Sequence, residues 1–292
     1  MSPDGRRIAF GYSDARDTSV WVHDLTAGGS ARRLTFGGHD RFPIWSSDSQ
    51  RVIFQSDREG DLGLFWQRAD GVGAAERLTK PDKDIAHVPL SASPDGRLLL
   101  VDRTTDAGRP ASALGALTDA RTSLQVFSFA DRSITPFGGV SSALRTGAVF
   151  SPDGRWVAYS TRDAQRQQGI TLVQPFPATG AKFQISTNMQ DGHHPVWSSD
   201  GKELFYTPGG GSRLIGVTVT ASQGFAFGPA PAVVRPFINR SGASERPFDA
   251  ARDGKAFLGL VPAGAGSGDP SRQEIRVVVN WFDDLKARAP VK

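Results

Sequence analysis

Histidine, carboxylate and arginine side chains recur at one position of the chain's organisation, in short polar segments that each precede a predicted strand. Four of the five histidines lie there. Imidazoles and carboxylates can bind metal ions, and guanidinium groups bind anions. The candidate ligand-binding residues are His39, Asp40, Arg41, His87, Arg145, Asp191, His193, His194, Glu245 and Arg246. The alternative is that they are ordinary polar residues at loop ends, since their spacing fixes no coordination geometry. We assign no catalytic residue, metal ligand or cofactor.

A second set of acidic residues belongs to a short phrase that recurs six times, in the form Ser-Pro-Asp-Gly or a close variant. The phrase is typical of a hairpin turn, because Pro presets one dihedral angle, Asp bonds nearby backbone and Gly accepts a positive φ. Ser49 replaces Gly in the second copy, so we expect a looser or mildly strained turn there. We interpret the repeated Asp as structural, neither calcium-binding nor catalytic. The copies lie at Ser2–Gly5, Ser46–Ser49, Ser93–Gly96, Ser151–Gly154, Ser198–Gly201 and Ala251–Gly254.

Several established signatures are absent from the sequence. It contains no Gly-x-Ser-x-Gly, no His-Glu-x-x-His, no phosphate-binding loop and no kinase catalytic loop. It also contains no Cys, which excludes disulfides, thiolate metal sites and a Cys nucleophile. The 34 Lys and Arg residues are interleaved with 30 Asp and Glu residues, which argues against a nucleic-acid partner. No apolar run is long enough to be a transmembrane segment.

Short strands that flank each copy of the turn must position all these residues. The strands are rich in β-branched and aromatic residues and are separated by clusters of Gly, Pro, Asp and Ser. Four strands recur per copy, at a period of 44 to 58 residues between successive Asp residues. This pattern predicts an all-β protein, a β-propeller of about six four-stranded blades. We expect one domain over 1–292, with units at about 1–36, 37–80, 81–138, 139–188, 189–238 and 239–282, and a tail at 283–292 that contains a short helix.

The first and last units are incomplete in the predicted pattern. The first lacks an inner strand before Ser2, and the last lacks a clear fourth strand after Val279. Unpaired strand edges favour aggregation, so we interpret the chain as a piece of a longer protein, which includes a fragment of a seven-bladed ring. The alternative is a six-bladed ring with two short blades. Tryptophans such as Trp45, Trp66 and Trp197 lie inside predicted strands, and we expect them to pack between blades.

The repeat resembles the TolB-type β-propeller repeat. The resemblance rests on an apolar strand, Ser-Pro-Asp-Gly, an Ile-Ala-Phe-like strand and a closing Arg-Leu-Thr. It is best over Ser2–Thr35 and Phe42–Thr79 and covers nearly the whole chain. Residues 275–286 also resemble the end of propellers carried behind bacterial membrane-bound serine/threonine kinases. Both resemblances imply an extracytoplasmic, periplasmic location.

These observations favour a non-catalytic propeller that binds a protein, a peptide or a small ligand at the channel rim, where the candidate ligand-binding residues lie. The kinase resemblance implies the sensor part of a receptor-type kinase, and the TolB resemblance implies a periplasmic scaffold. We therefore expect no enzyme activity. Two alternatives stay open: a metal-dependent hydrolase or lyase that uses the His and Asp residues of the rim, and the propeller of a serine peptidase whose catalytic domain lies elsewhere.

Overall fold

The computed structural model describes eleven stretches of the chain and consists of β-strands joined by turns and loops. The described residues are 1–13, 17–26, 30–105, 122–162, 169–186, 191–209, 213–220, 224–234, 246–251, 257–262 and 273–278. No helix of the length and apolarity that a bilayer span requires occurs in these ranges. The predicted helix near the C-terminus, the predicted tail and the sixth copy of the turn beyond Ala251 lie outside them.

The strands form six antiparallel sheets, which confirms the all-β prediction. The first sheet contains β1 (Arg7–Ser13), β2 (Thr18–Asp24) and β3 (Arg32–Arg33). The second contains β4 (Arg41–Trp45), β5 (Arg51–Ser56), β6 (Gly63–Arg68) and β7 (Glu76–Arg77). The third contains β8 (Ala86–Ala92), β9 (Leu98–Thr104), β10 (Thr122–Ser128) and β11 (Ile134–Ser142).

The remaining three sheets repeat the same order. The fourth contains β12 (Val149–Phe150), β13 (Trp156–Arg162), β14 (Gly169–Pro175) and β15 (Phe183–Gln184). The fifth contains β16 (Gly192–Trp197), β17 (Glu203–Pro208), β18 (Arg213–Thr220) and β19 (Ala226–Val234). The sixth contains β20 (Phe248–Ala250), β21 (Phe257–Pro262) and β22 (Gln273–Val278). We call these sheets blades 1 to 6; within the described residues, blades 1 and 6 have three strands each, as expected.

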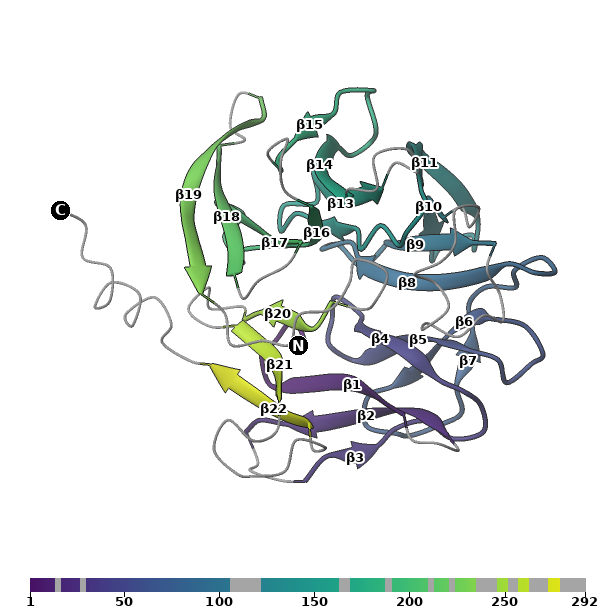
Figure 1. Cartoon of the computed structure of the whole chain (residues 1–292). Coiled ribbons are helices and arrows are strands. Elements are labelled where there is room, and N and C mark those ends of the chain that lie inside the picture. Colours follow the sequence, from purple (N-terminus) through teal and green to yellow (C-terminus); the bar gives the residue numbers. More distant parts are fainter. Residues whose placement is uncertain are drawn as a thin grey trace.

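The blades follow one another around the middle of the molecule (Figure 1). Strands β4, β8, β16 and β20 lie towards the middle, whereas β3, β11, β15 and β19 lie at the outside. The first strand of each blade contacts the preceding blade, from β1 with β4 through to β16 with β20. Near the centre, the Met1 amino group forms an ion pair with Asp249 Oδ2 at 2.7 Å, so the start of the chain lies against blade 6.

The core lies between successive blades and not in one central mass. Among the described residues, five apolar clusters each join two neighbouring sheets. Trp45 packs with Val20 and Val52 between blades 1 and 2, and Trp197 packs with Ala158 between blades 4 and 5. These two tryptophans are buried, which confirms their expected role. Such packing supplies most of the favourable free energy of a repeat protein, because each blade buries its faces only against its neighbours.

The recurring turn has the predicted structure at all five copies within the described residues. In each, the Ser hydroxyl donates to the Asp carboxylate at 2.5 to 2.8 Å. The same Ser oxygen accepts the backbone N–H five residues later at 2.9 to 3.0 Å, which ties the turn to the following strand. Ser49 has a φ of 60°, so the second turn holds a non-glycine residue in the left-handed region, as the sequence predicted.

Two predictions about fourth strands need correction. We expected a strand at 233–237 after a loop, but β19 begins at Ala226 and pairs with β18. Its Pro229 and Pro231 obscured it in the sequence, yet proline is tolerated in an outermost strand, where one edge needs no N–H donors. The closing Arg-Leu-Thr is also only partly strand, because β7 ends at Arg77. The hydroxyl of Thr79 instead accepts the backbone N–H of Leu64 at 3.0 Å.

Candidate functional site

Blades 2, 4 and 5 share a backbone irregularity, which lies within β4 and β16 and just before β12. The residue four positions before the turn serine has a positive φ in each: Phe42 (56°), Gly147 (56°) and His194 (56°). The pairing register also shifts here, between Arg41 and Ile44 in blade 2 and between His193 and Val196 in blade 5. Such bulges redirect side chains and bend the strand. They set the orientation of the candidate residues beside them. We call the candidate ligand-binding residues together the rim.

Asp40 is the most buried candidate of blade 2. Its side chain is fully buried, and its Oδ1 accepts a hydrogen bond from Arg58 Nη2 at 2.9 Å. The Arg58 guanidinium lies over the rings of Phe54 and Phe65, at 5.2 and 5.1 Å from their centroids. The other oxygen, Asp40 Oδ2, has no hydrogen-bond partner among the described residues. A buried carboxylate needs such a cation, because an unpaired charge is strongly destabilising.

The other candidates of this segment are more accessible. His39 is half exposed and its Nδ1 lies 2.8 Å from Asp57 Oδ2, an ion pair when the ring is protonated. Arg41 is exposed. The His39 backbone N–H also donates to the Asp57 carboxylate at 2.8 Å, and although burial opposes it, these contacts hold the pKa of Asp57 below its usual value. His39 therefore ties its loop to Asp57.

His87 is buried in β8, and its Nδ1 lies 2.9 Å from Thr79 Oγ1. Burial, together with the nearby Arg103 charge, lowers the pKa of His87 to about 4. The ring is therefore neutral at physiological pH. Gln55 of β5 donates to the His87 carbonyl at 2.6 Å, so this histidine links blades 2 and 3. A neutral imidazole donates from one ring nitrogen and accepts at the other, and the contact with Thr79 uses Nδ1.

Arg145 precedes blade 4 in the chain, but its side chain contacts blade 2. Its guanidinium carbon is 3.9 Å from the ring centroid of Phe42, so a residue that leads into blade 4 contacts one of blade 2. Beside it, the buried Asp102 of β9 accepts hydrogen bonds from the Thr146 backbone N–H at 2.9 Å and its hydroxyl at 2.6 Å. Burial raises the pKa of Asp102 to about 6, although these bonds and the Arg145 charge oppose the shift.

The candidates of blade 5 lie in or just before β16. His193 and His194 are both buried, and their Nδ1 atoms are 2.9 Å apart. One ring must donate to the other at that distance. Asp191 accepts the Gly169 backbone N–H at 2.5 Å and thereby holds the start of β14.

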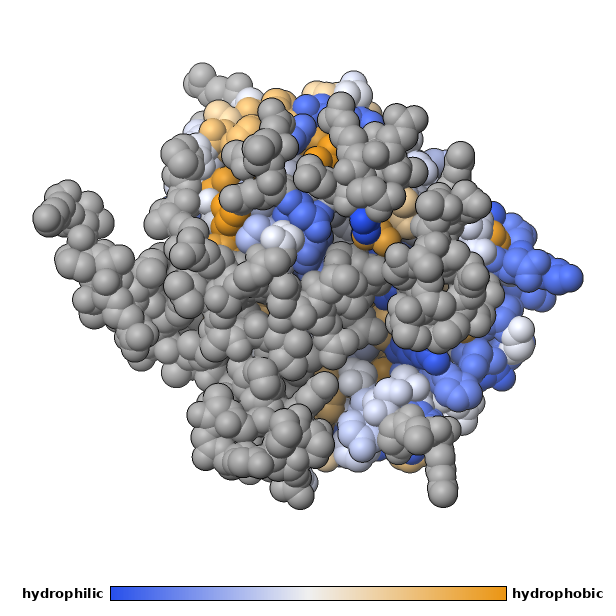
Figure 2. All heavy atoms as spheres, viewed as in Figure 1, coloured by the Kyte–Doolittle hydropathy of each residue, from blue (hydrophilic) through white to orange (hydrophobic). Residues whose placement is uncertain are grey.

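Arg246 connects blade 5 to blade 6. It donates to the Pro195 carbonyl at 2.9 Å and to the Phe248 carbonyl at 3.0 Å, and it lies 3.4 Å from Asp249. Glu245, the last candidate, lies outside the described residues. The described surface beside β6, β7 and β8 is mainly hydrophilic (Figure 2), as loops exposed to water require.

Of the candidates, the structure shows direct side-chain contact between His193 and His194, whereas the contacts given for Arg145 and Arg246 are to other groups. His193 meets His194, Arg145 meets Phe42 and Arg246 meets the backbone of β16. Within the described ranges, no three His, Asp or Glu residues are placed to hold a metal ion. Sequence reasoning missed Asp102, Arg58 and Phe42. Asp102 carried a signal, because an acidic residue directly follows the apolar run Leu98–Val101 inside a predicted strand.

No family model matches the chain. A curated protein of Bacillus subtilis (strain 168), named uncharacterized peptidase YuxL, is 26% identical to it over 212 residues. That match covers 70% of this chain but 28% of the Bacillus protein, so the chain spans little more than a quarter of that relative's length.

Solved structures show the fold. TolB from Acinetobacter baumannii has a TM-score of 0.68 at 15% identity, covering 94% of this chain and 61% of that one. An oligogalacturonate lyase from Vibrio parahaemolyticus has a TM-score of 0.62 at 13% identity, covering 96% and 73%. A puromycin-hydrolyzing peptidase of Mycobacterium tuberculosis has a TM-score of 0.56 at 14% identity, covering 95% and 46%. The chain therefore has a TolB-like β-propeller fold.

The expectation that this chain is not an enzyme is wrong in light of these comparisons. The sequence relative is named a peptidase, and the structures of similar fold include a lyase and a second peptidase. The expectation rested on the absence of catalytic motifs from these 292 residues. That absence was weak ground, because in both peptidases the part similar to this chain is less than half of the polypeptide.

Proposed function

We propose that this chain is the propeller domain of a serine peptidase. The observation that carries the proposal is the match to the Bacillus peptidase, which extends over 70% of this chain yet leaves most of that protein unmatched. A nucleophile-bearing domain would lie in such an unmatched part, since this sequence has no Gly-x-Ser-x-Gly of its own. The similarity in fold to the mycobacterial peptidase supports the same arrangement of a propeller and a separate catalytic domain.

In this proposal the rim controls which peptides reach the catalytic domain. The contact between Arg145 and Phe42 joins two blades that are not neighbours, so it narrows the space between them. Arg145 presents a positive charge there, next to the buried carboxyl of Asp102. The partner at the rim is then a peptide, one of the partner classes that the sequence pattern already favoured.

The other hypotheses about function are not supported by a sequence match of this kind. A metal-dependent rim enzyme needs a cluster of ligands, which the described residues do not form. A sensor of a receptor-type kinase rests on residues 275–286, and the structure describes the side chain of none of them. A periplasmic scaffold rests on the TolB-like fold alone, which hosts unrelated activities.

A fluorophosphonate probe, which reacts with activated serine nucleophiles, tests the proposal on the natural polypeptide that carries this chain. We expect one labelled band, and we expect prior incubation with an irreversible serine-hydrolase inhibitor to remove the label. Heat-unfolded protein is the control, because labelling must depend on an assembled site. An unlabelled native protein would contradict the proposal.

A further inference from the structure

The edge of β1 that faces the middle of the propeller has no partner strand among the described residues. β1 pairs with β2 from Arg7 to Ser13, and the sheet of blade 1 has the order β1-β2-β3. The equivalent strands of the other blades each pair with a strand on both sides; they are β5, β9, β13, β17 and β21. Blade 1 therefore lacks an innermost strand, and one edge of β1 is free.

The backbone groups on this free edge are assigned from the turn. The Ser2 backbone N–H donates to the Arg7 carbonyl at 2.8 Å, so Arg7 faces the free edge. Because the residues of an antiparallel strand alternate between its two edges, the N–H and C=O groups of Ala9 and Gly11 face it as well. Such groups are a template for a further strand, because each can form a hydrogen bond with an extended backbone.

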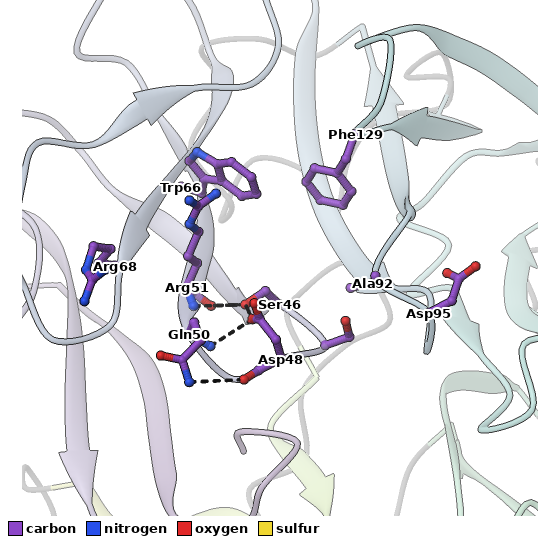
Figure 3. A pocket seen from close by; sticks show the side chains of 11 residues that line it. Ser46, Asp48, Gln50, Arg51, Trp66, Arg68, Ala92, Asp95 and Phe129 are labelled. Carbon is purple, nitrogen blue, oxygen red and sulfur yellow. Dashed lines mark hydrogen bonds between the residues drawn. The ribbon is translucent and has the colours of Figure 1, made fainter.

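Blade 2 has the same turn together with its inner strand. Figure 3 shows this turn, in which Ser46 accepts the Arg51 backbone N–H at 2.9 Å, as the turn serine of blade 1 also does for its own strand. Beyond the turn, β4 pairs with β5, and Ile44 lies opposite Ile53. Counted from the turn serine, Ile53 corresponds to Ala9. The two blades therefore differ in the inner strand and not in the turn.

The exposure of β1 agrees with a missing strand. Gly11 is exposed, and Tyr12 beside it is 50% exposed. Gly11 lies nine residues after its turn serine. The residues at this position in blades 2 to 5 are at most 5% exposed; they are Gln55, Asp102, Ser160 and Thr207. The inner half of blade 1 is thus open where the equivalent part of four other blades is covered.

Met1 determines the place and the direction of an added strand. It directly precedes its turn serine, as Trp45 does in blade 2. A residue joined to the Met1 amino group would therefore lie opposite Ala9, in the place that Ile44 has in blade 2. The Met1 nitrogen lies 2.7 Å from Asp249 Oδ2, and as a peptide N–H it can still donate to that oxygen.

The inner strands of other blades indicate the chemistry of this strand. Ile44 packs against the apolar cluster between blades 2 and 3, so an aliphatic residue belongs at the position before Met1. The inner strands of blades 2 and 5 both have proline before a β-branched residue, Pro43 before Ile44 and Pro195 before Val196. A short, extended and apolar segment therefore fits the edge, and proline is compatible with it.

We propose that the free edge of β1 holds an innermost strand of the natural polypeptide, from outside residues 1–292, that is antiparallel to β1 and leads into Met1. This strand would pair with Ala9 and Gly11 and would complete blade 1 with four strands. The inference rests on the proposed function in one respect, because both require a polypeptide longer than this chain.

Hydrogen–deuterium exchange of backbone N–H groups, read by NMR, tests the proposal. At Ala9 and Gly11, exchange should be at least about tenfold slower in the natural polypeptide than in this chain alone, because a paired N–H exchanges only when its bond opens. Ile8 and Phe10 are the internal controls, since their N–H groups face β2 and should be protected in both proteins. Equal exchange at Ala9 and Gly11 in the two proteins would overturn the proposal.

An extension of this chain tests the edge itself. Adding Arg-Phe-Pro-Ile, the sequence of residues 41–44, before Met1 should slow exchange at Ala9 and Gly11 by a similar factor. Gly-Ser-Gly-Ser at the same place is the matched control, because it has the same length but little tendency to form a strand. Equal exchange with the two extensions would show that the edge accepts no strand. Fluorophosphonate labelling does not depend on these N–H groups, so the two proposals can fail separately.

Discussion

At the scale of single residues, Asp102 makes the sharpest prediction about stability. Burial raises its pKa to about 6 in the folded protein, from an ordinary value of 3.8. The folded state therefore binds this proton more tightly than the unfolded chain does. The contribution of Asp102 is fully present below about pH 3.8 and is lost as the pH rises towards 6, a loss of about 3 kcal/mol.

Asp102→Asn should remove that loss. The asparagine can accept the Thr146 backbone N–H through its oxygen and donate to the Thr146 hydroxyl through its amide. We expect the variant to gain stability relative to the natural protein as the pH rises from 4 to 7. Urea unfolding at several pH values measures the difference, and a difference that does not change with pH would show that Asp102 ionises normally.

Tyr159 makes an independent prediction. The ring is buried, and its hydroxyl has no hydrogen-bond partner among the described residues. Tyr159→Phe should leave the free energy of unfolding unchanged or raise it by about 1 kcal/mol, because no hydrogen bond is lost. Tyr159→Ala is the control and should cost about 3–5 kcal/mol through the cavity it leaves. A large loss in Tyr159→Phe would reveal a partner for the hydroxyl.

At the scale of elements, the turn serine should stabilise each blade through two linked bonds. In blade 4, Ser151 donates to Asp153 at 2.5 Å and accepts the Trp156 N–H at 3.0 Å. Ser151→Ala should cost about 1–3 kcal/mol. In a double-mutant cycle with Asp153→Ala, the two losses should not add, because both variants break the same bond. Strict additivity in denaturant unfolding would contradict this account of the turn.

The pH dependence of the turns has the opposite sign to that of Asp102. Burial opposes the shift, but the bonds from Ser151 and from Arg155 hold the pKa of Asp153 below 3.8. This carboxylate therefore stabilises the fold above its ordinary pKa and stops doing so as the pH falls through the lowered value. Acid unfolding should begin with the turns.

Most of the elements could be predicted because the turn phrase is local. Ser, Pro, Asp and Gly encode the hairpin within four residues, so the flanking strands followed. The prediction placed the strand of β19 too late, at 233–237, because its prolines mask the first part of an outer strand. The rim was predicted as a set of residues but not as contacts. The contact of Arg145 with Phe42 depends on the bulge at Phe42 and on where the segment before blade 4 lies relative to blade 2. Neither can be predicted from the sequence of one repeat.

At the scale of the whole molecule, the rim joins residues of blades that are not neighbours, because Arg145 before blade 4 contacts Phe42 of blade 2. Arg145→Gln removes a cation that lies against Phe42 and should widen the rim without disturbing the blades. In the natural polypeptide, we expect this variant to hydrolyse longer peptides faster relative to dipeptide amides. The measurement is the ratio of the two values of kcat/KM. An unchanged ratio would mean that the rim does not select substrates.

The most direct test of the central claim is the release of 4-nitroaniline from an aminoacyl or dipeptidyl 4-nitroanilide by the natural polypeptide that carries this chain. A serine peptidase with this propeller should give steady turnover, and a fluorophosphonate should abolish it. Turnover that is absent across a panel of neutral, basic and acidic substrates, from a protein that is folded and homogeneous, would contradict the assignment.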